Sequence, residues 1–589
     1  IARSLERGLN RAASDDPGLS PPQRSVRAAF LDAWGRIEPT LQKGLAQLVV
    51  FETTFTARAA EAVTGSTSQE LSRLAEESLL RRAAPGRYAM HPLVRALALR
   101  ELEETAGPPG PSASHDDRAE SLEAARHRHA AYYLDLVRRR QSAVRGPQPQ
   151  TAIAEIRREW ANVRRAWAWA VDRTALDHLS GAVSALSRLL VVTGALREGE
   201  EMFGAAAQRL RDEPGVFDGS QGRDLVAALL VEQARFLNEQ GCHGLAINPV
   251  QAALQLIHST ESADPSAHAA ARREWARALV PRGEFVSARA HIGHALTQAQ
   301  QAGDEGLRAD VHLLVGTIAL RQERYDNAGD ELEAALAHYR AIQDRRGEAE
   351  ARRSLGILAL RLHRHGTAKS QIHEALYLSQ AIGDRRAAAR TENALARLNI
   401  AHSNYPSAHK HCRRALRRAR ELGDRQGETE ALMTFGLLFL QEGKNEAAWL
   451  HSLEAAELAR SIGDRAIEGR ALTVLGHTFV EMTMPEQAAR AYGRARELQS
   501  ELGQPSLAAE SLAGLARVRL TDGDPAAAQT DVEAVLEHLS SRGLRGTIDP
   551  MRICLTCYEV LSAQGDPRAA EVLDAASSLF DGTLGQSGA

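Results

Sequence analysis

The most constraining feature of this 589-residue chain is a set of small or turn-forming residues that recurs every 40 positions. Three such series run in parallel: Gly303, Gln343, Gly383, Gly423, Gly463, Gly503 and Gly543; Ala328, Ala368, Ala408, Ala448, Ala488 and Ala528; and Gly316, Gly356, Ala396, Gly436, Gly476 and Ala516. Internal periods of roughly 20 to 50 residues are typical of solenoids, whose units bury their apolar faces by stacking on neighbours. The sequence therefore predicts a repeat array with a long binding surface and no catalytic cleft.

Each 40-residue unit is expected to be a pair of helices. Residues 305–322 and 326–342 carry apolar side chains at helical spacing, and Pro, Gly or Asn interrupts the pattern between such stretches. The glycines that end the units suit the left-handed position after a helix, and Asp384, Asp424 and Asp464 can cap the next helix.

These units resemble the tetratricopeptide repeat (TPR), in the 40-residue form common in bacterial regulators. Gly316, Ala328 and Ala335 match the family's small and alanine positions, whereas His312 and Ala319 replace its first-helix aromatics. The resemblance implies an all-α superhelical solenoid whose first helices line a concave groove. The family's groove positions correspond here to Arg321, Arg353, Arg361, Arg390, Asn393, Arg397, Arg470, His477 and Arg517.

Arg353, Arg361, Arg390, Asn393 and Arg397 form the densest basic cluster among these positions. Bidentate arginine contacts can hold a carboxylate or an acidic peptide, so these five are the candidate ligand-binding residues. Because acidic residues are interspersed, a solvated or internally salt-bridged groove is the alternative.

The amino-terminal quarter predicts a winged-helix domain. An amphipathic helix over 25–38 is followed by helical stretches at 56–63 and 69–80. A two-stranded hairpin is expected around Pro85-Gly86, and Pro92 suits the first position of a further helix.

Segments 24–27, 48–51, 78–81 and 88–95 resemble the winged-helix domain of the STAND class, the signal-transducing ATPases with numerous domains. In that family the His of a Met-His-Asp motif contacts the β-phosphate of ADP. Met90 and His91 match this motif, and Pro92 replaces its Asp. The resemblance implies that His91 senses nucleotide, that the chain contacts an upstream ATPase domain holding ADP or ATP, and that an oligomer forms on activation.

A DNA-binding winged helix is the competing interpretation, because that fold class includes many DNA binders. The expected recognition stretch carries Glu70, Glu76 and Glu77 against only Arg73, and these carboxylates would repel phosphates. The formal net charge of −3 gives no basic footprint either. We therefore expect an intramolecular hinge and no direct contact with nucleic acid.

The resulting domain organisation has six parts. They are the tail of an upstream ATPase lid with a linker (1–23), the winged helix (24–105), a Pro/Gly/Ser linker (106–119), a helical connector with degenerate repeats (120–218), the TPR solenoid (219–547), and capping helices with a tail (548–589). Because Ile1 is not an initiator Met, we expect an upstream portion that carries the ATPase and an effector.

Few features point to chemistry. The only Gly-Lys pair, Gly443-Lys444, is followed by Asn445 and does not fit a phosphate-binding loop. Cys554 and Cys557 form a C-x-x-C within an apolar helical stretch, where buried thiols are expected in place of a metal site. No nucleophile and base set is evident, so we expect no enzyme, metal or cofactor in this chain.

Four cysteines in so long a chain favour a reducing, cytoplasmic location, and no apolar run is long enough to suggest a membrane span. The preferred hypothesis is the sensing and autoinhibitory region of a STAND-type switch, which binds a peptide, protein or small molecule in the TPR groove. A freestanding TPR adaptor that bridges partner proteins is the alternative.

Overall fold

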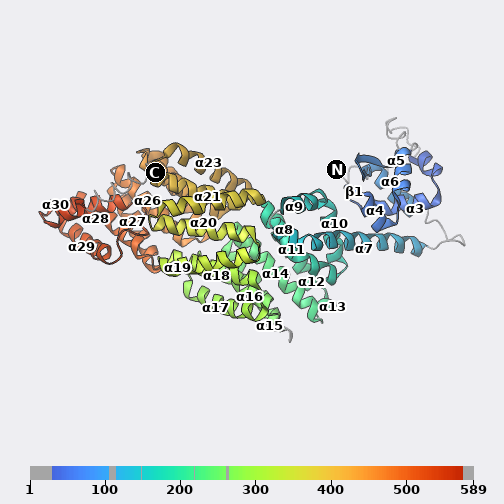
Figure 1. The fold of residues 1–589 in the computed structure, drawn as a ribbon, viewed down its shortest axis with the longest axis horizontal. Helices are drawn as coiled ribbons and strands as arrows, with labels where there is room; N and C mark the ends of the chain where they lie inside the picture. The colour runs from blue at the N-terminus through green and yellow to red at the C-terminus, as the bar shows by residue number, and fades with distance from the viewer. Residues whose placement is uncertain (1–29, 105–114, 147–148, 218, 260–263, 575–589) are drawn as a thin grey trace. The chain divides into compact units, whose positions relative to one another are not determined.

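The computed structural model describes residues 30–104, 115–146, 149–217, 219–259 and 264–574, which divide into two compact units (Figure 1). The first comprises Ile1–Ser142 and Thr151–Leu186, and the second comprises Ala143–Gln150 and Ser187–Ala589. The expected connector, 120–218, is thus shared between the units. The lid tail proposed at 1–23 and most of the linker proposed at 106–119 lie outside the described residues.

The first unit combines helices with a small sheet. Its elements are α3 (Pro39–Gln47), the 3₁₀ helix η1 (Leu48–Val50), β1 (Thr54–Thr56), α4 (Ala57–Thr64), α5 (Ser68–Glu76), β2 (Arg81–Ala84), β3 (Arg87–Ala89), α6 (Pro92–Glu104), α7 (His115–Arg139), α8 (Gln141–Arg145), α9 (Pro149–Arg158), α10 (Trp160–Asp172) and α11 (Leu176–Thr193), of which α8, α9 and α11 continue into or begin in the second unit. The expected hairpin is present as β2 and β3. The helix expected over 69–80 ends at Glu76, because Ser78 adopts a left-handed φ of 63°.

The sheet is antiparallel with strand order β1-β3-β2, so it contains one strand that the sequence pattern did not predict. Tyr88 at the centre of β3 pairs with Phe55 on one side and Arg82 on the other. Asn162 of α10 donates to the Thr54 carbonyl at 3.1 Å and accepts from the Glu52 amide at 2.8 Å. These bonds satisfy backbone groups beside the edge strand β1, which would otherwise lack partners.

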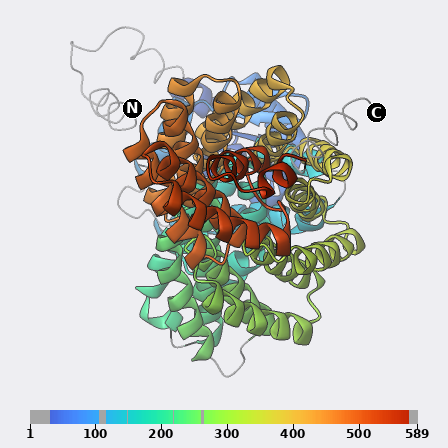
Figure 2. The ribbon, with the colours of Figure 1, turned by 90° about the vertical axis from the view of Figure 1, so that its left-hand side faces the viewer.

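The second unit is a succession of helix pairs. They are α12 (Leu196–Arg211), α13 (Pro214–Phe217), α14 (Ser220–Gln240), α15 (His243–His258), α16 (Pro265–Leu279), α17 (Phe285–Ala302), α18 (Glu305–Arg321), α19 (Tyr325–Ala341), α20 (Arg345–Arg361), α21 (His365–Ile382), α22 (Arg385–Ala401), α23 (Tyr405–Leu422), α24 (Arg425–Gln441), α25 (Asn445–Ile462), α26 (Arg465–Glu481), α27 (Pro485–Glu501), α28 (Pro505–Thr521), α29 (Pro525–Arg542) and α30 (Pro550–Ala563). Viewed end-on in Figure 2, the pairs from green through yellow to orange follow one another around a common axis.

The 40-residue series sets the geometry of each pair. The residues that end the units have left-handed backbone, including the non-glycine Gln343, whose φ is 56°. Gly316 lies where α18 crosses α19, and a Cβ there would sit 2.7 Å from Leu332 Cγ. A larger residue would force the two helices apart. The sequence prediction of paired helices in a TPR-like repeat is therefore confirmed.

The helix pairs wind into a superhelix whose successive turns touch. The Glu323 carboxylate, between α18 and α19, accepts hydrogen bonds from the Ser506 amide at 2.8 Å and the Leu507 amide at 3.3 Å, at the start of α28. The Arg465 amide likewise donates to the Pro281 carbonyl at 3.0 Å. Repeats that are distant in sequence thus touch, and their first helices enclose the solenoid axis.

Candidate functional site

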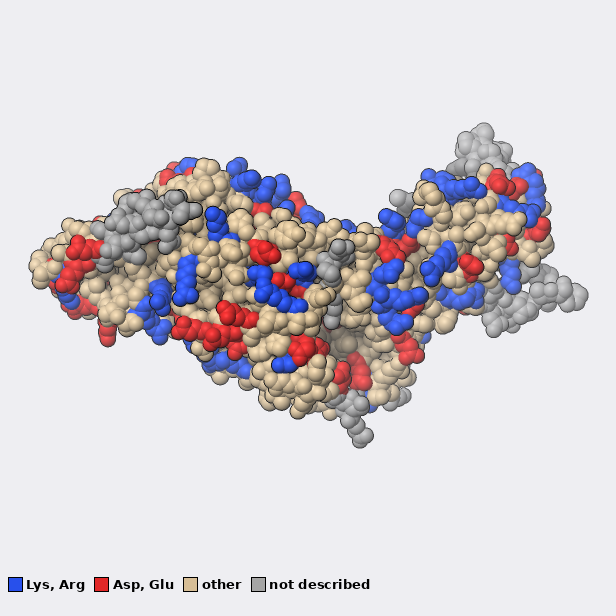
Figure 3. Space-filling view, viewed as in Figure 1, with Lys and Arg blue, Asp and Glu red and all other residues tan. Residues whose placement is uncertain are grey.

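The interior of the second unit is lined by charged side chains from the first helices of successive repeats, which we call the axial network. One repeat position runs Asp310, Glu350, Arg390, Glu430, Arg470 and Glu510. On the outer face drawn in Figure 3, basic and acidic residues lie close together. In the interior series, the sign of the charge differs from repeat to repeat: it is negative at 310, 350, 430 and 510, and positive at 390 and 470. Charges enclosed by protein must be paired or bind an ion, so the network is the first place to seek a binding site.

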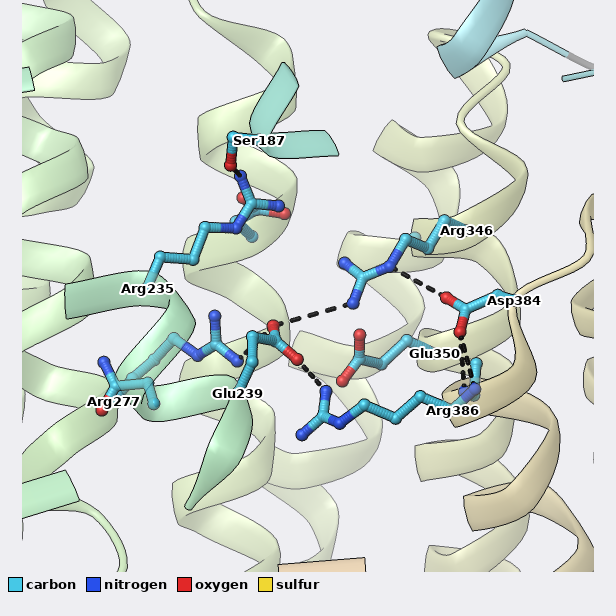
Figure 4. A network of polar contacts seen from close by, with 12 residues as sticks. Ser187, Arg235, Glu239, Arg277, Arg346, Glu350, Asp384 and Arg386 are labelled. Atoms are coloured by element: carbon cyan, nitrogen blue, oxygen red, sulfur yellow. Dashed lines mark hydrogen bonds and ion pairs between the residues drawn. The ribbon is translucent and has the colours of Figure 1, made fainter. Parts of the chain in front are cut away.

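Glu239 at the end of α14 is the centre of one part of the axial network (Figure 4). Its carboxylate is 2% exposed and meets Arg277 of α16 at 2.8 Å and Arg346 of α20 at 3.7 Å. It also forms an ion pair with Arg386 of α22. One carboxylate therefore joins four first helices across the axis.

The Asp residues that begin the first helices act both as helix caps and as ion-pair partners. Asp384 accepts from the Ala387 amide at 2.9 Å and from Arg346 Nε at 3.1 Å. Asp424 accepts from the Gly427 amide and from both Nε and Nη2 of Arg390, each at 3.0 Å. The amide contacts confirm the predicted N-caps. The ion pairs between these Asp residues and arginines of preceding first helices were not part of that prediction.

Two further capping Asp residues form ion pairs of this kind. Asp464 accepts from Arg321 at 3.1 and 3.2 Å, and Asp344 pairs with Arg188. Burial alone would raise the pKa of Asp424, but Arg386 and Arg390 hold the pKa of that carboxyl well below its ordinary value. These carboxylates are thus charged and committed to arginines.

The five groove candidates lie on α20 and α22, and their environments differ. Arg390 is bound in bidentate fashion by Asp424, and Arg353 lies 3.7 Å from Glu350 Oε1. Arg361 Nη1 donates to the Gly546 carbonyl at 2.7 Å. Asn393 is 5% exposed, and its Oδ1 has no hydrogen-bond partner among the described residues. Arg397 forms no hydrogen bond or ion pair with any described residue.

Sequence reasoning did not select Glu239, Arg346 or Arg386, and it gave Asp384 only a capping role. A signal was available for three of them, because Arg346 and Arg386 share one repeat position and the capping Asp residues share another. Glu239 lies in a repeat that is out of register with the others, so no periodic signal identified it.

The loop from Leu544 to Asp549, between α29 and α30, closes one end of the axis. The amides of Ile548 and Asp549 donate to Glu510 at 2.6 and 2.9 Å. Gly546 exchanges backbone and side-chain bonds with Arg361 and packs so closely on Tyr325 Oη that a side chain at Gly546 would collide with it. These contacts hold the loop against α20 and α28.

In the first unit, the nucleotide-sensing candidate His91 is exposed just before α6. Its Nδ1 accepts from the Leu93 amide at 3.2 Å, which satisfies one amide at the helix start. Met90 beside it is buried. The imidazole makes no other hydrogen bond or ion pair with a described residue.

A separate surface pocket of about 810 Å³ opens between α23, α24 and α25. It is lined by His409, Phe435, Phe439 and His451, whose rings contact one another, and by arginines of α23. Aromatic and arginine side chains are typical of protein interfaces, so this pocket is a second candidate contact site.

The described residues offer no metal centre, since no three His, Cys, Asp or Glu side chains gather as ligands. Cys554 and Cys557 are buried free thiols in α30, and burial raises the pKa of Cys557 to about 12. No described helix is both long and apolar enough to cross a membrane.

Comparisons with known proteins add three structural similarities. No protein-family model and no curated protein matches the chain. A Rap protein complexed with competence and sporulation factor is 15% identical, with a TM-score of 0.48 over 64% of this chain and 99% of that one. The Rap conjugation gene regulator of plasmid pLS20, in complex with the Phr* peptide, is 16% identical, with a TM-score of 0.41 over 60% and 95%.

The third similarity is to a STAND protein with a tetratricopeptide repeat sensor from Pyrococcus horikoshii. It is 14% identical, with a TM-score of 0.26, and covers 98% of this chain and 68% of that one. The second unit of the chain is a TPR-like helical repeat, as its own helix pairs and 40-residue spacing establish.

Proposed function

We propose that this chain is the sensing and autoinhibitory region of a STAND-type switch protein. In this proposal the solenoid recognises a ligand or protein partner through its interior groove. The first unit acts as a winged-helix hinge that relays the event to an upstream ATPase and effector. The hairpin, the accompanying helices and the exposed His91 support that role for the first unit.

The observation that carries the proposal is the set of ion pairs across the solenoid axis. Glu239 is bound to Arg346 and Arg386, and Arg321 is bound to Asp464, although these partners belong to distant repeats. An anionic group that competes for these arginines would favour a more open superhelix. A ligand with such a preference shifts the population of states, whereas one that binds both states equally shifts nothing.

The hinge role is tested by nucleotide release in a full-length protein that includes the upstream ATPase. We expect His91→Ala to accelerate dissociation of a fluorescent ADP analogue by about tenfold, the value of one lost charge-assisted hydrogen bond of about 1.4 kcal/mol. Arg82→Ala, on the exposed strand β2, is the matched control and should leave the rate unchanged. Equal rates in wild type and His91→Ala would contradict the hinge role.

A freestanding adaptor is the second candidate, favoured by the aromatic pocket on α23 to α25. Such a protein would bind a partner through Phe435 and Phe439 with no nucleotide switch. The two candidates are distinguished by the sequence upstream of Ile1. A G-x-x-x-x-G-K-S/T loop there supports the switch, and a nearby start codon supports the adaptor.

A further inference from the structure

Three interior arginines have no carboxylate partner among the described residues. Arg361 ends α20, Arg397 lies on α22 and Arg470 lies on α26, and each is half-buried. No described carboxylate oxygen lies within 4.0 Å of their guanidinium groups, and the buried Nε of Arg470 has no hydrogen-bond partner among the described residues. This set contrasts with Arg390, which forms an ion pair with Asp424.

The three guanidinium groups lie within electrostatic reach of one another. Burial, together with the nearby charge of Arg361, lowers the pKa of Arg397 to about 9. Burial and the charges of Arg361 and Arg397 likewise lower the pKa of Arg470 well below its ordinary value. Guanidinium groups stay protonated in proteins, so the repulsion destabilises the folded chain unless an anion enters.

The nearby acidic residues are already engaged or shared. The Glu323 carboxylate, near Arg361, is taken by the two amides of α28. Glu430 is near Arg397 and Arg470, but it also faces Arg321, Arg386 and Arg390 and forms no ion pair within 4.0 Å among the described residues. The local balance is therefore positive.

The sequence explains why Arg470 lacks a partner. Arg390 and Arg470 occupy the same repeat position, and Arg390 binds the Asp that lies 34 residues further on. The residue 34 positions after Arg470 is Gln504, a neutral amide. Gln504 Nε2 donates to the Arg321 carbonyl at 2.8 Å, and its buried Oε1 has no partner among the described residues.

We propose that Arg361, Arg397 and Arg470 form a binding site for a small oxyanion, either a phosphate or a carboxylate, inside the solenoid. The planar guanidinium forks suit both ligands, because each presents paired oxygens. The loop at Gly546 and the hydroxyl of Tyr325 lie beside Arg361 and bound the site on that side. The inference rests on the proposed function only in taking this anion as the ligand feature that the groove recognises.

The test is titration of the whole chain with inorganic phosphate and, separately, with succinate, at ionic strength held constant with sodium chloride. Heat of binding and thermal unfolding are recorded together. We expect a saturable signal and a rise in the unfolding midpoint of about 2 °C for wild type. The probe that saturates at lower concentration identifies the anion class.

Two variants remove the site in different ways. Arg470→Met removes one charge, and Gln504→Asp supplies the missing carboxylate. Both should unfold at a higher temperature than wild type without anion, and both should lose the saturable response. Any general salt effect of phosphate persists in the variants and is subtracted. Arg390→Met is the matched control, which should unfold at a lower temperature and keep the response.

The site is overturned if neither probe gives a saturable signal, or if Arg470→Met and Gln504→Asp both retain it. The outcome is separable from that of the proposed function. Saturable phosphate binding with no effect of His91→Ala on ADP release would leave the site standing and reject the switch. The reverse result would reject the site alone.

Discussion

Arg390 and Arg470 stand at the same repeat position, two repeats apart, yet only Arg390 has a counter-ion. Arg346, Arg386 and Arg390 each meet a carboxylate, either Glu239 or a capping Asp. Arg361, Arg397 and Arg470 meet none among the described residues, and the capping position that would serve Arg470 holds Gln504. The same repeat position therefore provides a structural ion pair at Arg390 and an arginine without a counter-ion at Arg470.

The largest expected effect comes from Glu239→Gln, which removes the charge shared by Arg277, Arg346 and Arg386. Breaking a buried ion pair leaves uncompensated charge and costs about 3 kcal/mol or more. We expect a clear fall in the urea midpoint measured by circular dichroism. An unchanged midpoint would mean that the matched region does not depend on its ion pairs.

Asp424→Asn should cost about 2 kcal/mol, because Asn can still cap α24 but removes the carboxylate that pairs with Arg390 and one of the two that pair with Arg386. The pKa of Asp424 is lowered in the folded state, so its contribution is present above the unfolded pKa of about 4 and is lost as the pH falls below that value.

Thermal unfolding from pH 7 to pH 3 measures this dependence. The wild-type curve should fall more steeply below pH 4 than the Asp424→Asn curve. Parallel curves would show that the carboxylate titrates alike in the folded and unfolded chains.

For the arginines that lack a carboxylate partner, a substitution that removes the charge should raise stability. Arg397→Met removes a charge that repels Arg361, and the methionine retains most of the apolar stem, so stability should rise by about 1 kcal/mol. The unfolding midpoint in chloride buffer measures the change. A decrease as large as that of Asp424→Asn would make the two regions equivalent.

The smallest effect is expected on the surface. Arg197 and Glu201 form an exposed pair one helical turn apart on α12. Exposed pairs of this kind contribute little, so Arg197→Ala should leave the midpoint unchanged within error. A measurable loss there would weaken the attribution of the other effects to burial.

The repeat architecture could be predicted from the sequence because its causes are local. The left-handed residues at the ends of the units and the capping of α22, α24 and α26 by Asp384, Asp424 and Asp464 follow from neighbouring residues alone. The pairing of Glu239 with Arg386 could not be predicted, because it depends on the small rotation at every intervening repeat. The candidate groove residues of α20 and α22 stay a prediction, and which of these arginines lacks a partner depends on such long-range contacts. The replacement of Asp by Gln504 in the Gly-Asp pair that ends a unit is visible in the sequence, so the missing carboxylate could have been predicted.

The bond from Glu323 to the start of α28 has a consequence for how such an array can evolve. Ordinary solenoids gain or lose whole repeats with modest penalty, because each unit contacts only its neighbours. Here α28 has no cap from its own side chains and relies on a carboxylate 183 residues earlier. Inserting or deleting one unit between them would carry Glu323 away from the start of α28, so this contact between successive turns restrains the number of repeats that separate its two partners.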